Sequence, residues 1–166
     1  MLLAVDVYYR ATDAKAVAIL FEQWIDQNIS QYYETIITEL HDYIPGEFYK
    51  RELPCIIEAL KPIDLQQVDF IIIDGYVYLN DDGKPGLGHY VYEYYNQKIP
   101  VIGVAKSNFH NNQIHMREVY RGESKNPLYI TSIGIDIDQA KHYITMMFGE
   151  YRMPYLLKLL DRLTKS

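Results

Sequence analysis

Three acidic residues lie within or directly beside long apolar runs of the sequence. Asp6 lies inside "LLAVDVYY", Glu52 directly precedes "LPCIIEAL", and Asp74 ends the run "VDFIIID". A carboxylate in an apolar strand is costly unless it is paired, hydrated or bound to a cation. Carboxylates held close together repel unless a cation joins them, and Mg²⁺ suits such a group because it prefers oxygen ligands and keeps replaceable waters. If folding brings these acids together, they predict metal-assisted hydrolysis of a phosphodiester.

Each acid also has an ordinary structural explanation. Asp6 could pair with a buried lysine, and Glu52 could simply favour the N-terminus of a helix. Asp74 is followed by a glycine, so it could simply start a turn. The three residues therefore point to a metal site only as a group.

The hydrophobic patterns predict three strands, a helix, a strand, a helix, a strand, a hairpin and two helices. Early antiparallel strands followed by alternating helices and strands indicate an α/β fold with a mixed sheet flanked by helices, the layout of a ribonuclease H-like fold. In this layout the first strand is central and the fourth lies beside it, so Asp6 and Asp74 become neighbours and the first helix brings Glu52 over them. The expected ranges are strands 2–10, 14–24 and 29–38, helix 51–61, a strand from 68 that ends at Asp74-Gly75, helix 86–97, strand 99–107, hairpin strands 113–122 and 126–134, and helices 136–148 and 153–166.

The charges are unevenly distributed along the chain. The formal net charge of −6 argues mildly against a surface that grips nucleic acid everywhere. A metal-binding carboxylate cluster is compatible with that charge, because the metal offsets part of it. The C-terminal end is the best candidate for a phosphate-facing edge, although a solvated helix face explains its bases equally well. Those bases are Lys141, Arg152, Lys158, Arg162 and Lys165.

Cys55 is the only cysteine, so the chain can form no internal disulfide and no Cys-based zinc site. A reducing, cytoplasmic location fits this composition. No apolar run is long enough to cross a membrane, and no membrane partner is expected.

Several segments carry a family resemblance, and they occur in order along almost the whole chain. They are "VDVYY" around Asp6, "YIPGEFYKRELP" around Glu52, "IIIDGYVY" around Asp74, "GLGHYV", "PVIGVAKS" with Lys106, and "YRMPYLLKLLDRL". On these segments the chain resembles the endonuclease V family, the deoxyinosine 3′ endonucleases. The resemblance implies a ribonuclease H-like fold and a Mg²⁺-dependent enzyme of DNA repair, with Mn²⁺ able to substitute. Such an enzyme cuts the strand at the second phosphodiester 3′ to a deaminated base.

The resemblance also implies roles for individual residues. Asp6, Glu52 and Asp74 match the family's metal carboxylates, and Lys106 matches a lysine near the scissile phosphate, where its charge can stabilise a developing anion. Gly75 matches a backbone position in the pocket for the deaminated base, and His89 matches a family histidine; a turn glycine and a structural hydrogen-bonding histidine are equally ordinary explanations. The stiff loop that enters the duplex is matched by Tyr43, Ile44, Pro45 and Gly46.

The chain departs from the family pattern in ways that leave its activity open. We expect one domain over residues 1–166, without the longer N-terminal segment that members usually carry. The fourth metal-site residue should follow the last strand, where Asp136 is the candidate and Asp138 the fallback; either could instead cap a helix. The expected partner is DNA containing deaminated bases. The alternatives are a nuclease acting on inosine in RNA and a nucleic-acid-binding homologue that no longer cuts.

Overall fold

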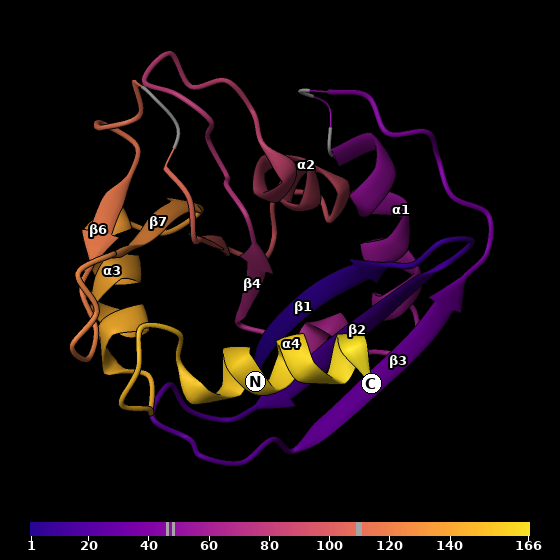
Figure 1. The fold of residues 1–166 in the computed structure, drawn as a ribbon, viewed down its shortest axis with the longest axis horizontal. Coiled ribbons are helices and arrows are strands. Elements are labelled where there is room, and N and C mark those ends of the chain that lie inside the picture. Colours follow the sequence, from indigo (N-terminus) through magenta and orange to yellow (C-terminus); the bar gives the residue numbers. More distant parts are fainter. Residues whose placement is uncertain (46, 48, 109–110) are drawn as a thin grey trace.

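The computed structural model of the protein describes residues 1–45, 47, 49–108 and 111–166. Within that part of the chain the strands form one sheet in the order β3-β2-β1-β4-β5-β7-β6 (Figure 1). The strands are β1 (Leu2–Tyr9), β2 (Ala14–Phe21), β3 (Gln31–Ile37), β4 (Phe70–Asp74), β5 (Val101–Ala105), β6 (Arg117–Val119) and β7 (Leu128–Ile133). The helices are α1 (Tyr49–Leu60), α2 (Leu87–Tyr94), α3 (Ile137–Met146) and α4 (Tyr155–Lys165), with one 3₁₀ turn at Leu65–Gln67.

The sheet is mixed, as the order of elements in the sequence predicts. Strands β1, β2 and β3 form an antiparallel meander, β1, β4 and β5 are parallel, and β5, β7 and β6 are antiparallel. The predicted ribonuclease H-like layout is therefore confirmed, including the central β1 with β4 beside it. Because Val5 pairs with Ile73, the residues that follow them, Asp6 and Asp74, reach the same edge of the sheet.

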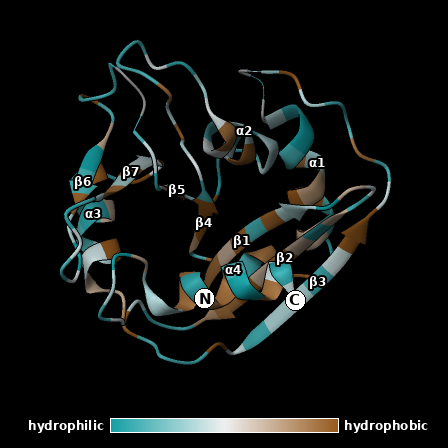
Figure 2. Cartoon of the chain, in the orientation of Figure 1, coloured by the Kyte–Doolittle hydropathy of each residue, from teal (hydrophilic) through white to brown (hydrophobic). Residues whose placement is uncertain are grey.

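Two hydrophobic layers lie on opposite faces of the sheet because successive strand residues alternate between faces. Leu3 and Val5 pack with α1 and α2, whereas Leu2 and Ala4 pack with α3 and α4. In Figure 2 the hydrophobic colour gathers in the central strands and the hydrophilic colour lies mainly on the loops around the rim. The alternation places Asp6 on the side of Ala4, which α4 covers.

The fourth strand ends at Asp74 in the structure, where the sequence predicts its end, and it begins at Phe70. Gly75 follows with a φ of +131°, a backbone conformation that residues other than glycine rarely adopt. At this residue the chain turns away from β4. The chain then crosses β5 so closely that a Cβ atom added to Gly103 would lie 2.5 Å from the Gly75 carbonyl oxygen. The apolar residues after Asp74 therefore cover the sheet instead of extending it.

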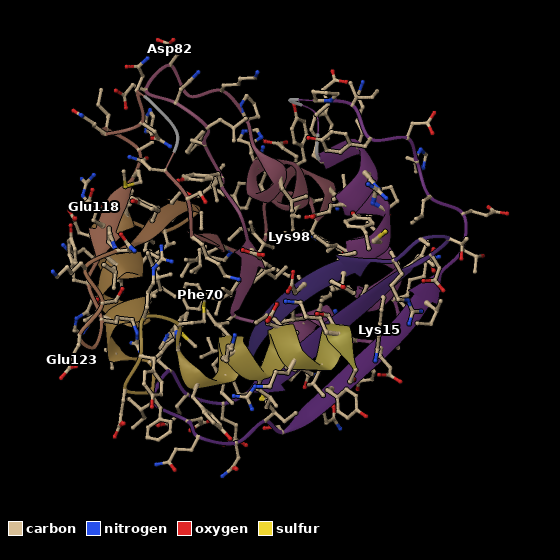
Figure 3. All side chains as sticks on the ribbon, in the orientation of Figure 1. Lys15, Phe70, Asp82, Lys98, Glu118 and Glu123 are labelled. Atoms are coloured by element: carbon tan, nitrogen blue, oxygen red, sulfur yellow. The ribbon has the colours of Figure 1, made fainter. Side chains whose placement is uncertain are left out.

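Helix α4 lies across β1 and β2, and a buried lysine fixes its last turn (Figure 3). Lys15 Nζ lies 3.1 Å from Glu34 Oε2 and donates a hydrogen bond of 3.0 Å to the backbone oxygen of Ser166. A cation at the C-terminal end of a helix is favourable because the last carbonyl groups carry partial negative charge. The contact fixes the position of α4 over the sheet.

The described residues contain no helix that is long and apolar enough to cross a membrane.

Gly122 allows the segment after β6 to pass directly against the backbone of Glu150. Its φ is +61°, and an added Cβ atom would overlap the Glu150 carbonyl oxygen. Gly83 has a similar φ of +77°, but an added Cβ atom there would meet only His115 Nε2, at 4.0 Å. Alanine substitutions at these two positions therefore distinguish two costs. Both would strain the backbone, but only the substitution at Gly122 would also overlap another part of the main chain.

We expect Gly122→Ala to destabilise the fold more than Gly83→Ala, as measured by urea unfolding. Gly83→Ala should cost about 1–2 kcal/mol for the left-handed backbone. Gly122→Ala should cost about 1–3 kcal/mol more, because the backbone of Glu150 must move. Equal losses in the two variants would contradict the close approach.

Candidate active site

Asp6 is held near the end of β1 by the hydrophobic strand around it. The Val7 backbone N–H donates a hydrogen bond of 2.9 Å to Asp6 Oδ1. Burial, followed by the charge of Asp74, raises the pKa of Asp6 from its ordinary 3.8 to about 7. Lys15, the buried lysine of β2, pairs with Glu34, so the structure does not support the explanation that Asp6 is half of a buried ion pair.

Asp74 is the last residue of β4 and keeps an accessible side toward solvent. The surrounding protein still withdraws water from its carboxylate, and this burial is the main reason that the pKa of Asp74 is raised. Lys106 partly offsets the increase, and the negative charge of Asp161 adds to it. Asp74 therefore lies between charges of both signs.

Glu52 lies in the first turn of α1 and approaches the same point from the other face of the sheet. Burial and then the charges of Asp6 and Asp74 raise its pKa from 4.5 to about 8. The positive charge of Arg51 opposes this only partly. Like-charge repulsion of this kind requires proximity. The structure thus brings the three predicted carboxylates into one electrostatic group.

Asp161 of α4 joins this group, although it was not among the site residues predicted from the sequence. It lies 18% exposed beside Asp6 and Asp74, and its Oδ1 is 3.0 Å from Lys165 Nζ. The signal in the sequence is weak: an acid four residues after Leu157, at the border of the apolar face of an amphipathic helix. Such an acid is normally a solvated surface residue. Only the packing of α4 on β1 shows that Asp161 lies beside Asp6 and Asp74.

Two neighbouring hollows meet at this group. One, on the α4 side, is lined by Asp6, Asp74, Lys106 and Asp161 together with apolar residues of α4. The other encloses about 940 Å³ of empty space open to solvent, and the residues that line it include Tyr49, Glu52, Asp74, Gly75, Gly86, Leu87 and Lys106. Asp74 and Lys106 line both hollows, so a ligand in one would lie next to a ligand in the other.

Lys106 follows directly after β5 and is exposed. Arg152 Nη2 donates hydrogen bonds of 2.6 Å to the backbone oxygens of both Lys106 and Pro127. This guanidinium therefore ties the end of β5 to the segment that precedes α4. The main chain at Lys106 is fixed, while its ammonium group remains accessible from both hollows.

The other predicted contact residues lie in two places. Tyr43, Ile44 and Pro45 are exposed in the loop before α1, whose first residue, Tyr49, lines the larger hollow. Gly46 lies outside the described residues.

His89 lies on α2 between the rings of Tyr78 and Tyr90 and lines neither hollow. Its buried Nδ1 has no hydrogen-bond partner among the described residues. A role for His89 in contacting nucleic acid stays a prediction.

Comparison with known proteins places this arrangement in a family. The family model for endonuclease V matches residues 1–162. The chain belongs to the endonuclease V family. Its relatives include endonuclease V of Sulfolobus acidocaldarius, 28% identical over 99% of this chain and 81% of the relative. Endonuclease V of Saccharolobus solfataricus is 27% identical over 98% of this chain and 80% of its own length.

Solved endonuclease V structures share the fold. Endonuclease V of Bacillus subtilis superimposes with a TM-score of 0.79 at 19% identity, covering 98% of this chain and 77% of the other. The Ciona intestinalis enzyme, in complex with a 24mer DNA containing an inosine followed by a ribo-adenosine, gives a TM-score of 0.82 at 14% identity and covers 99% of this chain and 84% of that one. At these identities the superpositions establish the fold.

Asp136, our candidate for the fourth acid of the endonuclease V site, does not join the carboxylate group. Ile133 of β7 pairs with Val101, the first residue of β5, so the chain leaves β7 at the end of the sheet opposite Asp74. Asp136 there caps α3 by accepting hydrogen bonds from the backbone N–H groups of Asp138 and Gln139, and Asp138 pairs with Arg117 at 2.9 Å. Asp136 therefore has the capping role that was the alternative to metal binding, and Asp138 lies in an ion pair with Arg117 instead.

The donor chemistry of the carboxylate group suits a hard divalent cation. Glu52 and Asp74 have no hydrogen bond or ion pair to their side chains within the described residues, and burial is the main reason that the pKa values of both are raised. Oxygen ligands of this type fit Mg²⁺. No three His, Cys, Asp or Glu side chains in the described ranges already have a metal-holding arrangement, so binding would require the carboxylates to draw together.

The raised pKa values predict that the metal-free protein loses stability as the pH rises. Asp6 and Glu52 titrate at about 7 and about 8 when folded, against ordinary values of 3.8 and 4.5. Between about pH 4 and pH 8 the folded state therefore binds more protons than the unfolded state, and the free energy of unfolding falls with increasing pH. Glu52→Gln should reduce this fall, measured as the difference in melting temperature between pH 5 and pH 8 in EDTA.

The matched control is Glu58→Gln, which removes an exposed acid from the same helix. Its surface ion pair with Lys61 should matter little to stability. An unchanged pH difference in Glu52→Gln would show that Glu52 is not confined among like charges.

Proposed function

We propose that this protein is a Mg²⁺-dependent endonuclease, with Mn²⁺ able to substitute, that hydrolyses a phosphodiester 3′ to deoxyinosine in DNA repair. The observation that carries the proposal is the meeting of Asp6, Glu52 and Asp74 where two hollows join. The larger hollow has the size for a base and is lined by Glu52, the other is lined by Asp6 and Asp161, and Asp74 and Lys106 line both. Membership of the endonuclease V family supports the same chemistry.

The carboxylates would hold the cation, with Asp161 as the fourth acid. A bound divalent cation at such a site supplies an activated water and offsets charge on the leaving oxygen. Lys106 contributes a fixed positive charge beside the phosphate, because its main chain is held by Arg152. Lys165, paired with Asp161, limits the negative charge on that side of the site.

The larger hollow would receive the deaminated base after it leaves the stack. An enzyme that reads one base within a duplex must extrude it into a pocket. Gly75 presents backbone without a side chain at the edge of this pocket, next to Asp74, and its φ of +131° restricts the position to glycine. The exposed Tyr43-Ile44-Pro45 loop precedes the pocket and has the stiff, apolar character that suits insertion between bases.

An inosine-directed ribonuclease is the second candidate. The observation that favours it is the Ciona intestinalis complex, in which the inosine is followed by a ribo-adenosine. Three matched oligonucleotides separate the possibilities: inosine in DNA, inosine followed by one ribonucleotide, and inosine in RNA, each with Mg²⁺ and with EDTA. Nicking of the all-DNA strand supports the primary proposal, nicking only beside a ribonucleotide supports the second, and binding without nicking identifies a non-cutting homologue.

We expect Asp74→Ala to reduce nicking of the inosine strand to background while leaving the far-ultraviolet circular dichroism spectrum unchanged. Asp161→Asn should also lower the nicking rate. Removing an acid that is confined among like charges should not reduce the melting temperature at pH 8. Quantified strand cleavage on denaturing gels measures the effect.

The matched control is Asp136→Asn, which removes a carboxylate outside the group and keeps a good helix cap. Its nicking rate should equal that of the unchanged protein. Normal nicking by Asp74→Ala would refute the proposed role of the cluster.

We also expect Tyr43→Ala to reduce the preference for inosine-containing over plain duplex by about tenfold, because the loop loses the ring that supports the opened base step. Binding to plain duplex should change little. The measurement is the ratio of dissociation constants for the two duplexes in EDTA. Equal losses on both would argue against insertion of the loop.

A further inference from the structure

A third groove lies beside the carboxylate group, between residues 148–155 and the outer side of α4. It shares Met153 and Lys158 with the hollow that Asp6 and Asp161 line, so the two spaces adjoin. In Figure 1 the segment that leads from α3 into α4 lies directly before the first turn of α4. A strand that passes through the proposed site could therefore continue into this groove.

Three aromatic rings form the groove without being buried by the protein. Phe148, Tyr151 and Tyr155 are 41%, 76% and 42% exposed. The rings of Phe148 and Tyr155 meet edge to face at 5.8 Å, and Tyr151 contributes little to the core. Exposed rings of this kind offer flat faces on which unpaired bases can stack.

The main chain that carries these rings is fixed. Arg121 is 6% exposed, and it donates hydrogen bonds of 3.1 Å to the Gly149 carbonyl oxygen and 3.3 Å to that of Tyr151. The Tyr155 N–H donates a bond of 2.8 Å to the Phe148 carbonyl oxygen. A platform that is already ordered loses little conformational entropy when a ligand binds.

The groove is also positively charged, on a chain whose net charge is −6. Lys158 and Arg162 lie one helical turn apart and line it together. Arg162 has no ion pair within the described residues, and Lys158 has only a distant one, 3.8 Å from Asp161. Glu150 is the one acid among the lining residues. Cations alternating with exposed rings match a single nucleic-acid strand, which carries phosphates on one side and bases on the other.

We propose that this groove binds an unpaired stretch of the target strand next to the cleaved bond. Phosphates lie against Lys158 and Arg162, and one or two bases stack on Tyr151 and Tyr155. The inference rests on the proposed function and narrows its substrate class to nucleic acids whose inosine strand is single-stranded on one side of the lesion. A fully paired flank keeps its bases in the duplex stack, out of reach of the rings.

The test is binding measured by fluorescence anisotropy in EDTA, so that cleavage is not required. One inosine strand is presented in a blunt duplex, in a duplex left unpaired 5′ of the inosine, and in one left unpaired 3′ of it. We expect the protein to bind one of the two partly unpaired forms about tenfold more tightly than the blunt duplex. Tyr151→Ala should remove about that factor for the unpaired form alone, since stacking of one base has this magnitude.

Arg162→Gln should weaken binding of the same form and lower the slope of log affinity against log salt by about 0.7, the value for one lost phosphate contact on a single strand. The matched controls are Tyr94→Ala and Lys98→Gln, exposed residues on or just after α2, which packs on the other face of the sheet. Both controls should bind all three forms normally.

The proposal is overturned if Tyr151→Ala and Arg162→Gln bind every form as the unchanged protein does. It is equally overturned if they lose affinity for the blunt and unpaired forms alike, because that would indicate general electrostatic attraction. Failure of the proposed function gives a different result: no nicking, with Tyr151-dependent binding retained. Normal nicking with neutral groove variants defeats only the present inference.

Discussion

The parallel pairing of β1 with β4 is the constraint on which the site depends. Because Val5 pairs with Ile73, two aspartates follow side by side at one edge of the sheet. The hydrophobic strands and α4 withdraw water from them, and Glu52 arrives from the other face. The fold therefore maintains repulsion among carboxylates that it could have avoided with neutral residues. Crowded carboxylate oxygens of this kind are the ligands that the proposed divalent cation would need.

Helix α4 connects this site to the rest of the surface. Its inner side packs on β1 and β2 and places Asp161 beside the aspartates, while its outer side carries Lys158 and Arg162. Lys15 fixes the last turn, and Arg121 and Arg152 fix the segment before the first turn. The position of one helix therefore determines both the charge of the proposed metal site and the shape of the adjoining groove.

The net charge of the chain gives little guidance about its partner, because the charges are sorted in space. The acids that repel one another are gathered around the two adjoining hollows, and three of the C-terminal bases, Arg152, Lys158 and Arg162, line the neighbouring groove. An acidic protein can in this way present a locally positive path for a strand. The mild argument from net charge against nucleic-acid binding does not hold at the level of the surface.

Much of the fold follows from the sequence by itself, because its signals are local. Strands are marked by alternating apolar and polar residues or by continuous apolar runs, and a Pro-Gly pair precedes α1. Asp136, directly before the first residue of α3, caps that helix. The positions of Asp6, Glu52 and Asp74 in the apolar pattern single out these acids, the family resemblance adds Lys106, and the structure brings the four residues together around two adjoining hollows. What only the tertiary structure decides is the direction in which distant elements run. The antiparallel pairing of β7 with β5 carries Asp136 to the far end of the sheet, and the packing of α4 places Asp161 beside Asp6 and Asp74. Both placements depend on contacts between segments that are far apart in the sequence. The amphipathic pattern of α4 shows which side of the helix packs on the sheet, but it does not show which residues Asp161, at the edge of that side, will contact.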